Sequence, residues 1–120
     1  MGGFTLTVRR GPKVERVRFG ELAVALNELE RRARELSGTV RTPRVDLHVR
    51  RFEPVQRVAA RLELRGPGRV RAGVDVRGDG SAESYTGRLR RRIVAQRGAE
   101  NAYEALRREL GAPRASGGIL

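Results

Sequence analysis

The residues with the clearest capacity for chemistry are arginines that alternate with apolar residues between positions 57 and 92. This stretch reads RVAARLELRGPGRVRAGVDVRGDGSAESYTGRLRRR. A guanidinium group donates hydrogen bonds in a fixed fork that fits phosphate and carboxylate oxygens. Because every second side chain of a strand lies on one face, the pattern predicts a sheet face rich in arginine. We expect that face to bind a polyanion through Arg61, Arg65, Arg71, Arg88, Arg90 and Arg92.

The net charge of the chain is strongly positive. Its 120 residues include 26 basic and 14 acidic side chains, a net charge of +12, and Lys13 is the single lysine. Such an excess favours an anionic partner, above all RNA or DNA. A GC-rich genome would also enrich surface positions in arginine, so composition alone leaves both explanations open. The same side of the sheet would hold Arg57, and a preceding strand could add Arg44 and Arg50.

We expect contacts that are sensitive to salt and only weakly specific for sequence. The expected arginine face has no aromatic ring on which bases could stack, which leaves the phosphate backbone to be recognised. A second hypothesis is a structural or protein-interaction module that binds an acidic protein or forms a homo-oligomer through a free sheet edge. That alternative stays open because Asp46, Glu63 and Asp75 would partly neutralise the arginines.

Side chains suited to catalysis or metal binding are sparse. The chain has no cysteine, which excludes disulfides, thiolate metal sites and cysteine nucleophiles. His48 is the only histidine, and one imidazole without a second histidine or a cysteine does not complete a metal site. The carboxylates are dispersed among arginines and turns. We therefore expect no enzymatic activity, no metal and no cofactor.

Length and hydropathy indicate one domain and no membrane span. We expect a single domain over residues 1–110 and a flexible tail over residues 111–120. The opening MGGFTLTVRRG has no apolar run typical of a signal peptide, and no segment approaches the roughly 20 apolar residues of a membrane span. These features predict a cytoplasmic protein without membrane contact.

A β-hairpin is expected to open the fold. Residues 4–10 and 14–19 alternate apolar and polar side chains around the turn at Gly11-Pro12. An antiparallel pairing closed at this turn gives the opposing pairs Phe4–Phe19, Leu6–Val17 and Val8–Glu15.

Helical spacing and a further strand follow the hairpin. From 21 to 37, leucine and alanine recur every three or four residues, which predicts an amphipathic helix packed against a sheet. Alternation over 45–50 predicts a strand that ends at Glu53-Pro54, because proline lacks a ladder donor. Residues 100–110 repeat the helical spacing and predict the last helix.

The arginine-rich stretch is expected to form an antiparallel meander with turns at 66–68 and 77–80. With Arg65 opposite Arg69, its first two strands give the pairs Leu62–Ala72, Ala60–Val74, Val58–Val76 and Glu63–Arg71. The second turn is expected to place Val74 opposite Glu83 and Ala72 opposite Tyr85.

Residues 81–95 fit two structures. As a strand, they alternate inward positions with the arginines at 88, 90 and 92. As a helix, they align Tyr85, Leu89 and Ile93 on one stripe behind Ser81. Gly87 and the β-branched residues favour the strand. We therefore predict an α+β fold of order ββα-ββββ-α, with a mostly antiparallel sheet and both helices on its apolar face.

Part of the chain resembles a known family. The stretch VAARLELRGPGRVRA within 57–72, followed by RLRRRI, is similar to the ribosome-hibernation family. Members of that family combine a strand, a helix, antiparallel strands and a terminal helix. The resemblance implies ribosomal RNA as the bound anion. The N-terminal hairpin and the strand-like 81–95 depart from the family's pattern.

Overall fold

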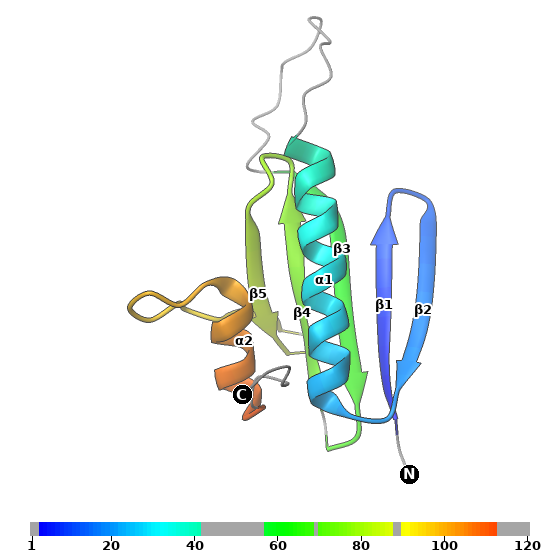
Figure 1. Ribbon diagram of the computed structural model, residues 1–120, viewed down its shortest axis with the longest axis vertical. Coiled ribbons are helices and arrows are strands. Elements are labelled where there is room, and N and C mark those ends of the chain that lie inside the picture. The colour runs from blue at the N-terminus through cyan, green and yellow to red at the C-terminus, as the bar shows by residue number, and fades with distance from the viewer. Residues whose placement is uncertain (1–2, 42–56, 69, 88–89, 113–120) are drawn as a thin grey trace, which may run out of the picture.

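The protein is an α+β structure in which two helices cover one face of an antiparallel sheet (Figure 1). The computed structural model describes residues 3–41, 57–68, 70–87 and 90–112. Its elements are β1 (Phe4–Arg10), β2 (Lys13–Phe19), α1 (Leu22–Arg41), β3 (Val58–Gly66), β4 (Val70–Arg77), β5 (Ala82–Thr86), β6 (Arg92–Ile93) and α2 (Ala102–Leu110). The strand order is β2-β1-β3-β4-β5-β6. The predicted fold class is confirmed, while the strand predicted over 45–50 lies outside the described residues.

The N-terminal hairpin has the register that its alternation predicts. Phe4 lies opposite Phe19, Leu6 opposite Val17, and Val8 opposite Glu15. The other edge of β1 pairs with β3, so β1 is an interior strand and β2 is a sheet edge. This arrangement follows from the apolar side chains of β1, since Leu6 and Val8 are buried beneath α1.

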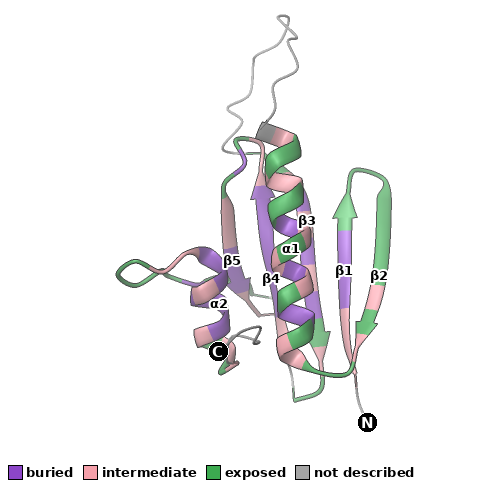
Figure 2. Ribbon diagram, viewed as in Figure 1, coloured by how far each residue is buried: buried purple, intermediate pink, exposed green. Residues whose placement is uncertain are grey.

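α1 packs its apolar stripe across the sheet. Ala25, Leu26, Leu29 and Ala33 are buried in the core, in agreement with the predicted helical spacing. The helix continues to Arg41, four residues beyond the predicted end at 37. Figure 2 shows the buried side of α1 turned toward the strands and its exposed side turned toward the viewer.

β3 and β4 form the centre of the sheet in a register that differs from the prediction. The observed pairs are Leu64–Ala72, Leu62–Val74 and Ala60–Val76, two residues from those expected. Gly66 pairs with Val70, so the turn begins one residue later than expected and β3 extends to Gly66. A shift of two residues preserves the alternation, and the apolar face of both strands is as predicted except at Val58, which lies beyond an irregularity of the ladder, pairs with Arg77 and is exposed. Glu63, however, lies opposite Gly73 instead of Arg71.

The prediction of a continuous strand over 81–95 is wrong. β5 ends at Thr86, Gly87 follows with φ +108°, and β6 returns antiparallel to β5. Only glycine adopts this φ readily, and a Cβ at Gly87 would lie 2.4 Å from the carbonyl oxygen of Arg90. The glycine therefore permits the reversal that ends the strand.

The register between β4 and β5 also differs from the prediction, here by one residue. Val74 lies opposite Ser84 and Gly73 opposite Tyr85. Arg77 and Ser81 close a three-residue loop, with Gly80 at φ +88°. A three-residue hairpin loop with a left-handed glycine is a common connection, and it differs from the predicted two-residue turn. A one-residue shift exchanges the faces, so Ser84 enters the core and Tyr85 leaves it.

α2 is fixed at both ends and tied to α1 by a buried arginine. Asn101 and Glu104 form a capping box at its start, and Gly111 ends it in the left-handed conformation. Arg107 is 6% exposed, and it donates to Glu30 at 2.8 Å and to Asn27 at 2.9 Å. Burial raises the pKa of Glu30, but the hydrogen bonds from Arg107 and Arg34 outweigh this effect and lower the pKa overall.

Replacing the buried arginine should weaken the junction between the helices. Arg107→Ala leaves oxygen atoms of Glu30 and Asn27 without a charged donor in a partly buried site. We expect the free energy of unfolding, measured by urea titration, to fall by about 1.5–3 kcal/mol. The control Arg31→Ala removes an exposed arginine of α1 and should have a much smaller effect. Equal losses in the two variants would contradict the role of Arg107.

The start of α2 should make stability depend on pH. Hydrogen bonds from Arg108, and from the backbone N–H of Arg97, lower the pKa of Glu100 to about 2. Because folding lowers this pKa from 4.5, the contribution is complete above about pH 4.5 and is lost as the pH falls toward about 2. Glu100→Gln should therefore destabilise the protein at about pH 6 and have less effect at about pH 3, as measured by urea unfolding. The control Glu109→Gln, an exposed residue of the same helix, should show no such change. An equal effect of Glu100→Gln at both pH values would contradict this account.

Candidate nucleic-acid interface

The face of the sheet opposite α1 and α2 is covered by no described helix (Figure 1). Residues that alternate with the buried core positions of each strand point to this side. We call it the open face. Its side chains, taken from the register, are Val14, Arg16 and Arg18 on β2; Thr5, Thr7 and Arg9 on β1; Arg61, Glu63 and Arg65 on β3; Arg71, Gly73, Asp75 and Arg77 on β4; Glu83 and Tyr85 on β5; and Ile93 on β6.

One row across the open face contains arginine and no acid. The register places Arg18, Thr5, Arg65 and Arg71 side by side on β2, β1, β3 and β4. With strands about 4.8 Å apart, the row is on the order of 14 Å long. We call its three arginines, Arg18, Arg65 and Arg71, the basic row. Among the described residues, none of the three has an ion pair.

The central pair of the basic row is electrostatically unfavourable. Arg65 and Arg71 lie directly opposite each other on β3 and β4, and like charges in this position repel. Arg65 is exposed and Arg71 is half-buried, so an anion can reach both from solvent. An anion between them would remove the repulsion and accept hydrogen bonds from two guanidinium groups.

Two acidic side chains of the open face, Asp75 and Glu83, lie away from the basic row, whereas Glu63 lies beside Arg65 on the same face of β3. Asp75 accepts hydrogen bonds from Arg61 at 2.7 and 3.1 Å, and Glu83 accepts one from Arg77. The hydrogen bond to Asp75 raises the pKa of Arg61. Arg61 is one of the predicted binding residues, but its guanidinium group is already held by a carboxylate. On the open face, the arginines without an ion pair to a described residue are Arg16 and the three of the basic row.

Tyr85 is an aromatic residue of the open face, whereas the predicted pairing with Ala72 would place it on the apolar face. It is 4% exposed, and its hydroxyl lies 2.4 Å from where a Cβ of Gly73 would be. The guanidinium group of Arg91 lies over its ring at 4.7 Å from the centroid. Glycine in the middle of a strand often marks a close approach, so Gly73 was the sequence feature that could have indicated a bulky neighbour.

The hydroxyl of Tyr85 is buried without a hydrogen-bond partner among the described residues. Burial, and secondarily the negative charge of Glu63, raise the pKa of Tyr85 to about 12. The hydroxyl therefore stays protonated at neutral pH. Glu63 itself forms long ion pairs, at 3.5 Å with Arg91 and 3.4 Å with Arg9.

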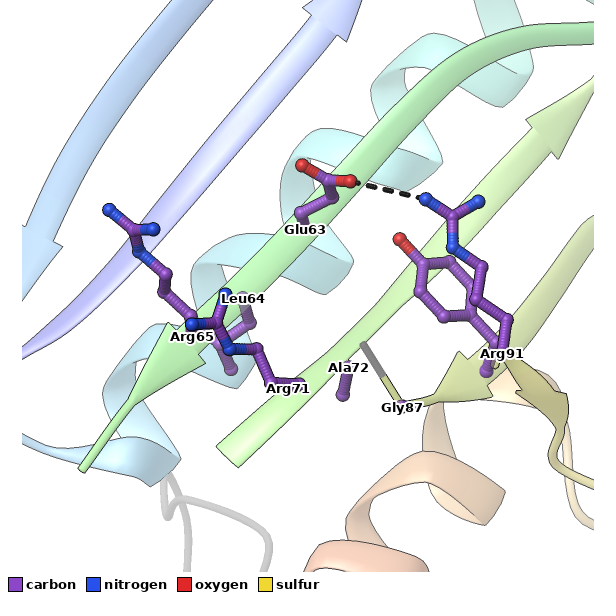
Figure 3. A pocket seen from close by; sticks show the side chains of 8 residues that line it. Glu63, Leu64, Arg65, Arg71, Ala72, Gly87 and Arg91 are labelled. Carbon is purple, nitrogen blue, oxygen red and sulfur yellow. Dashed lines mark hydrogen bonds and ion pairs between the residues drawn. The ribbon is translucent and has the colours of Figure 1, made fainter. Parts of the chain in front are cut away.

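A hollow of about 120 Å³ lies between these side chains. Figure 3 shows Arg65 and Arg71 on one side of it and Glu63 and Arg91 on the other. The hollow thus joins the inner end of the basic row to the pair formed by Arg91 and Tyr85.

The predicted row over 88, 90 and 92 is not formed by one strand. Arg88 lies outside the described residues, and Arg90 is exposed in the connection between β5 and β6. Arg92 pairs with Thr86, whose alternation places it on the helix-covered face. Of the predicted residues, the structure therefore gathers Arg61, Arg65 and Arg71 on one face and separates Arg92 from them. Arg44 and Arg50 lie outside the described residues.

Two absences can be stated for the described part of the chain. Within it, no three histidine, cysteine, aspartate or glutamate side chains form a group that could hold a metal ion. No helix in the same residues combines the length and the apolar character needed to cross a membrane.

Comparisons with known proteins give no relative. No protein-family model, no curated protein and no solved structure matches the chain. The similarity of residues 57–72 to the ribosome-hibernation family is therefore limited to the pattern of that segment and does not establish membership.

Removing the hydroxyl of Tyr85 should not destabilise the fold. Because the hydroxyl is buried and unpaired, we expect Tyr85→Phe to leave the free energy of unfolding unchanged or to raise it by up to about 1 kcal/mol. Tyr103 is the matched control, since it is also buried but its hydroxyl interacts with Ser37. Tyr103→Phe should lower the free energy of unfolding by about 1 kcal/mol. A clear loss in Tyr85→Phe, measured by urea unfolding, would contradict the unpaired state.

Proposed function

We propose that the protein binds the phosphate backbone of RNA, such as ribosomal RNA, or of DNA through the open face of its sheet, without catalysing a reaction. The observation that carries the proposal is the basic row, in which Arg65 and Arg71 lie opposite each other, Arg18 lies beyond Thr5 in the same row, and none of the three has an ion pair with a described residue. Backbone phosphates supply repeated single negative charges, which match a line of guanidinium groups. Such partners are abundant in the cytoplasm, where we place the protein.

Backbone recognition is favoured over base recognition. The aromatic ring of Tyr85 is buried and lies beneath Arg91, so it offers no free surface for a base. A β-sheet face with long, mobile arginine side chains can follow a backbone without reading base edges. We therefore expect RNA and DNA of mixed sequence to bind with similar affinity, and binding to weaken steeply with salt.

A second candidate is a protein-interaction module that self-associates through a sheet edge. Its supporting observation is β2, an edge strand that pairs on one side only and exposes Val14. The charged residues Glu15, Arg16 and Arg18 along this strand oppose edge pairing, because natural proteins use such charges to prevent it. An acidic protein as partner would use the same open face as a nucleic acid.

Binding should depend on the basic row and on the salt concentration. We expect fluorescently labelled RNA and DNA of mixed sequence to bind in anisotropy titrations at about 50 mM salt. If the basic row contacts two or three phosphates, the logarithm of the binding constant should fall with the logarithm of salt concentration with a slope of about −1.5 to −3. The double variant Arg65→Ser/Arg71→Ser should weaken binding about tenfold or more and make the slope shallower by about 1 to 2.

The control removes the same charge from elsewhere on the surface. Arg31 on α1 and Arg97 in the loop before α2 are exposed residues outside the open face. Arg31→Ser/Arg97→Ser should therefore change neither the slope nor the affinity by a comparable amount. No binding by the unmodified protein at low salt would contradict the proposed function. Equal losses in the two double variants would show that net charge, and not the open face, drives binding.

A further inference from the structure

We infer that the hollow beside Tyr85 is a subsite for one backbone phosphate, closed by Arg65, Arg71 and Arg91. This inference rests on the proposed function and names the place on the open face where a phosphate is held most firmly. Arg91 was not among the residues that the sequence pattern predicted, because a continuous strand would have turned it inward. The reversal at Gly87 brings it back over the open face.

Two of the three cations extend from paired positions of the central strands. Arg65 and Arg71 extend from directly opposite positions of β3 and β4, and both line the hollow (Figure 3). Neither forms an ion pair with a described residue. Their backbones are held by the ladder between the two central strands, so both side chains extend from neighbouring positions of the sheet before any ligand binds. A phosphate between them accepts charge-assisted hydrogen bonds from both sides.

The third cation is held by contacts that are not strong ion pairs. Arg91 lies over the ring of Tyr85 at 4.7 Å, and its distance to the carboxylate of Glu63 is 3.5 Å. Glu63 also faces Arg9 at 3.4 Å, so its single negative charge is shared between two arginines. Arg91 therefore retains hydrogen-bond donors for a ligand while its position is restricted by the ring beneath it. Tyr85 acts in this site as a positioning residue.

The close fit of Tyr85 on Gly73 fixes the ring. A Cβ at Gly73 would lie 2.4 Å from both the backbone oxygen of Leu62 and the hydroxyl of Tyr85. Only glycine at this position leaves room for the ring to lie against the sheet. Because Gly73 has no side chain, the ring of Tyr85 lies against the sheet, and Arg91 lies over that ring.

The test compares single variants in the same anisotropy titrations with labelled RNA and DNA. Arg91→Ser should weaken binding to every sequence about tenfold, because the phosphate shared with Arg65 and Arg71 loses a charge-assisted hydrogen-bond donor. The matched control Arg97→Ser, which removes an exposed arginine outside the open face, should leave the affinity unchanged. If Arg91→Ser leaves the affinity unchanged while Arg65→Ser/Arg71→Ser weakens binding, the subsite is overturned and the proposed function stands.

The positioning role of Tyr85 has its own comparison. Tyr85→Leu removes the aromatic surface beneath Arg91 and should weaken binding, whereas Tyr85→Phe keeps the ring and should bind like the unmodified protein. If Tyr85 had only a structural role, Tyr85→Leu would lower the thermal stability, but the folded Tyr85→Leu and Tyr85→Phe proteins would bind with equal affinity. Equal affinity of folded Tyr85→Leu and Tyr85→Phe would overturn the role of the ring.

A titration with inorganic phosphate tests the subsite independently of nucleic-acid binding. The amide signals of Gly73 and Gly87 in a ¹⁵N-labelled protein should shift saturably as phosphate is added, and Arg91→Ser should weaken that response. If RNA and DNA do not bind but phosphate gives this response, the proposed function fails and the phosphate subsite remains. If phosphate gives no response and RNA and DNA do not bind, both fail. Binding of a phosphoserine peptide in preference to RNA and DNA would overturn the occupant that we name.

Discussion

The structure depends on one constraint, the alternation of side chains along β3 and β4. Leu62 and Leu64 on β3 and Val74 and Val76 on β4 are at most 1% exposed, because α1 and α2 cover that face. Each intervening residue must then point to the other side of the sheet. The burial that stabilises the core therefore also presents the arginines on the open face.

The distribution of charge bears on the two explanations for the arginine excess. On α1, Arg31, Arg32 and Arg34 are each matched by a glutamate one helical turn away. The basic row has no such partners, and two of its arginines face each other across a strand pair. Enrichment by genome composition alone would not distinguish these two surfaces. The contrast supports a binding role for the open face more directly than the net charge does.

The open face combines arginines on paired central strands with an arginine on a short connection. The backbones of Arg65 and Arg71 are fixed by the central ladder, while Arg91 comes from a short connection that reverses at Gly87. Tyr85 links the two, since it belongs to β5 and supports Arg91. A phosphate site built in this way needs no pocket enclosed by loops, because the sheet itself provides the floor.

The sequence by itself determined the fold class, the N-terminal hairpin register and the apolar faces of α1, β3 and β4, since these follow from local periodicity. It also identified Arg65 and Arg71, whose face survives a register shift of two residues. Only the tertiary structure decided the face of Tyr85, the end of β5 and the position of Arg91. The reason is that a three-residue loop at 78–80 shifts the register by one, and the reversal at Gly87 depends on backbone geometry that composition does not reveal.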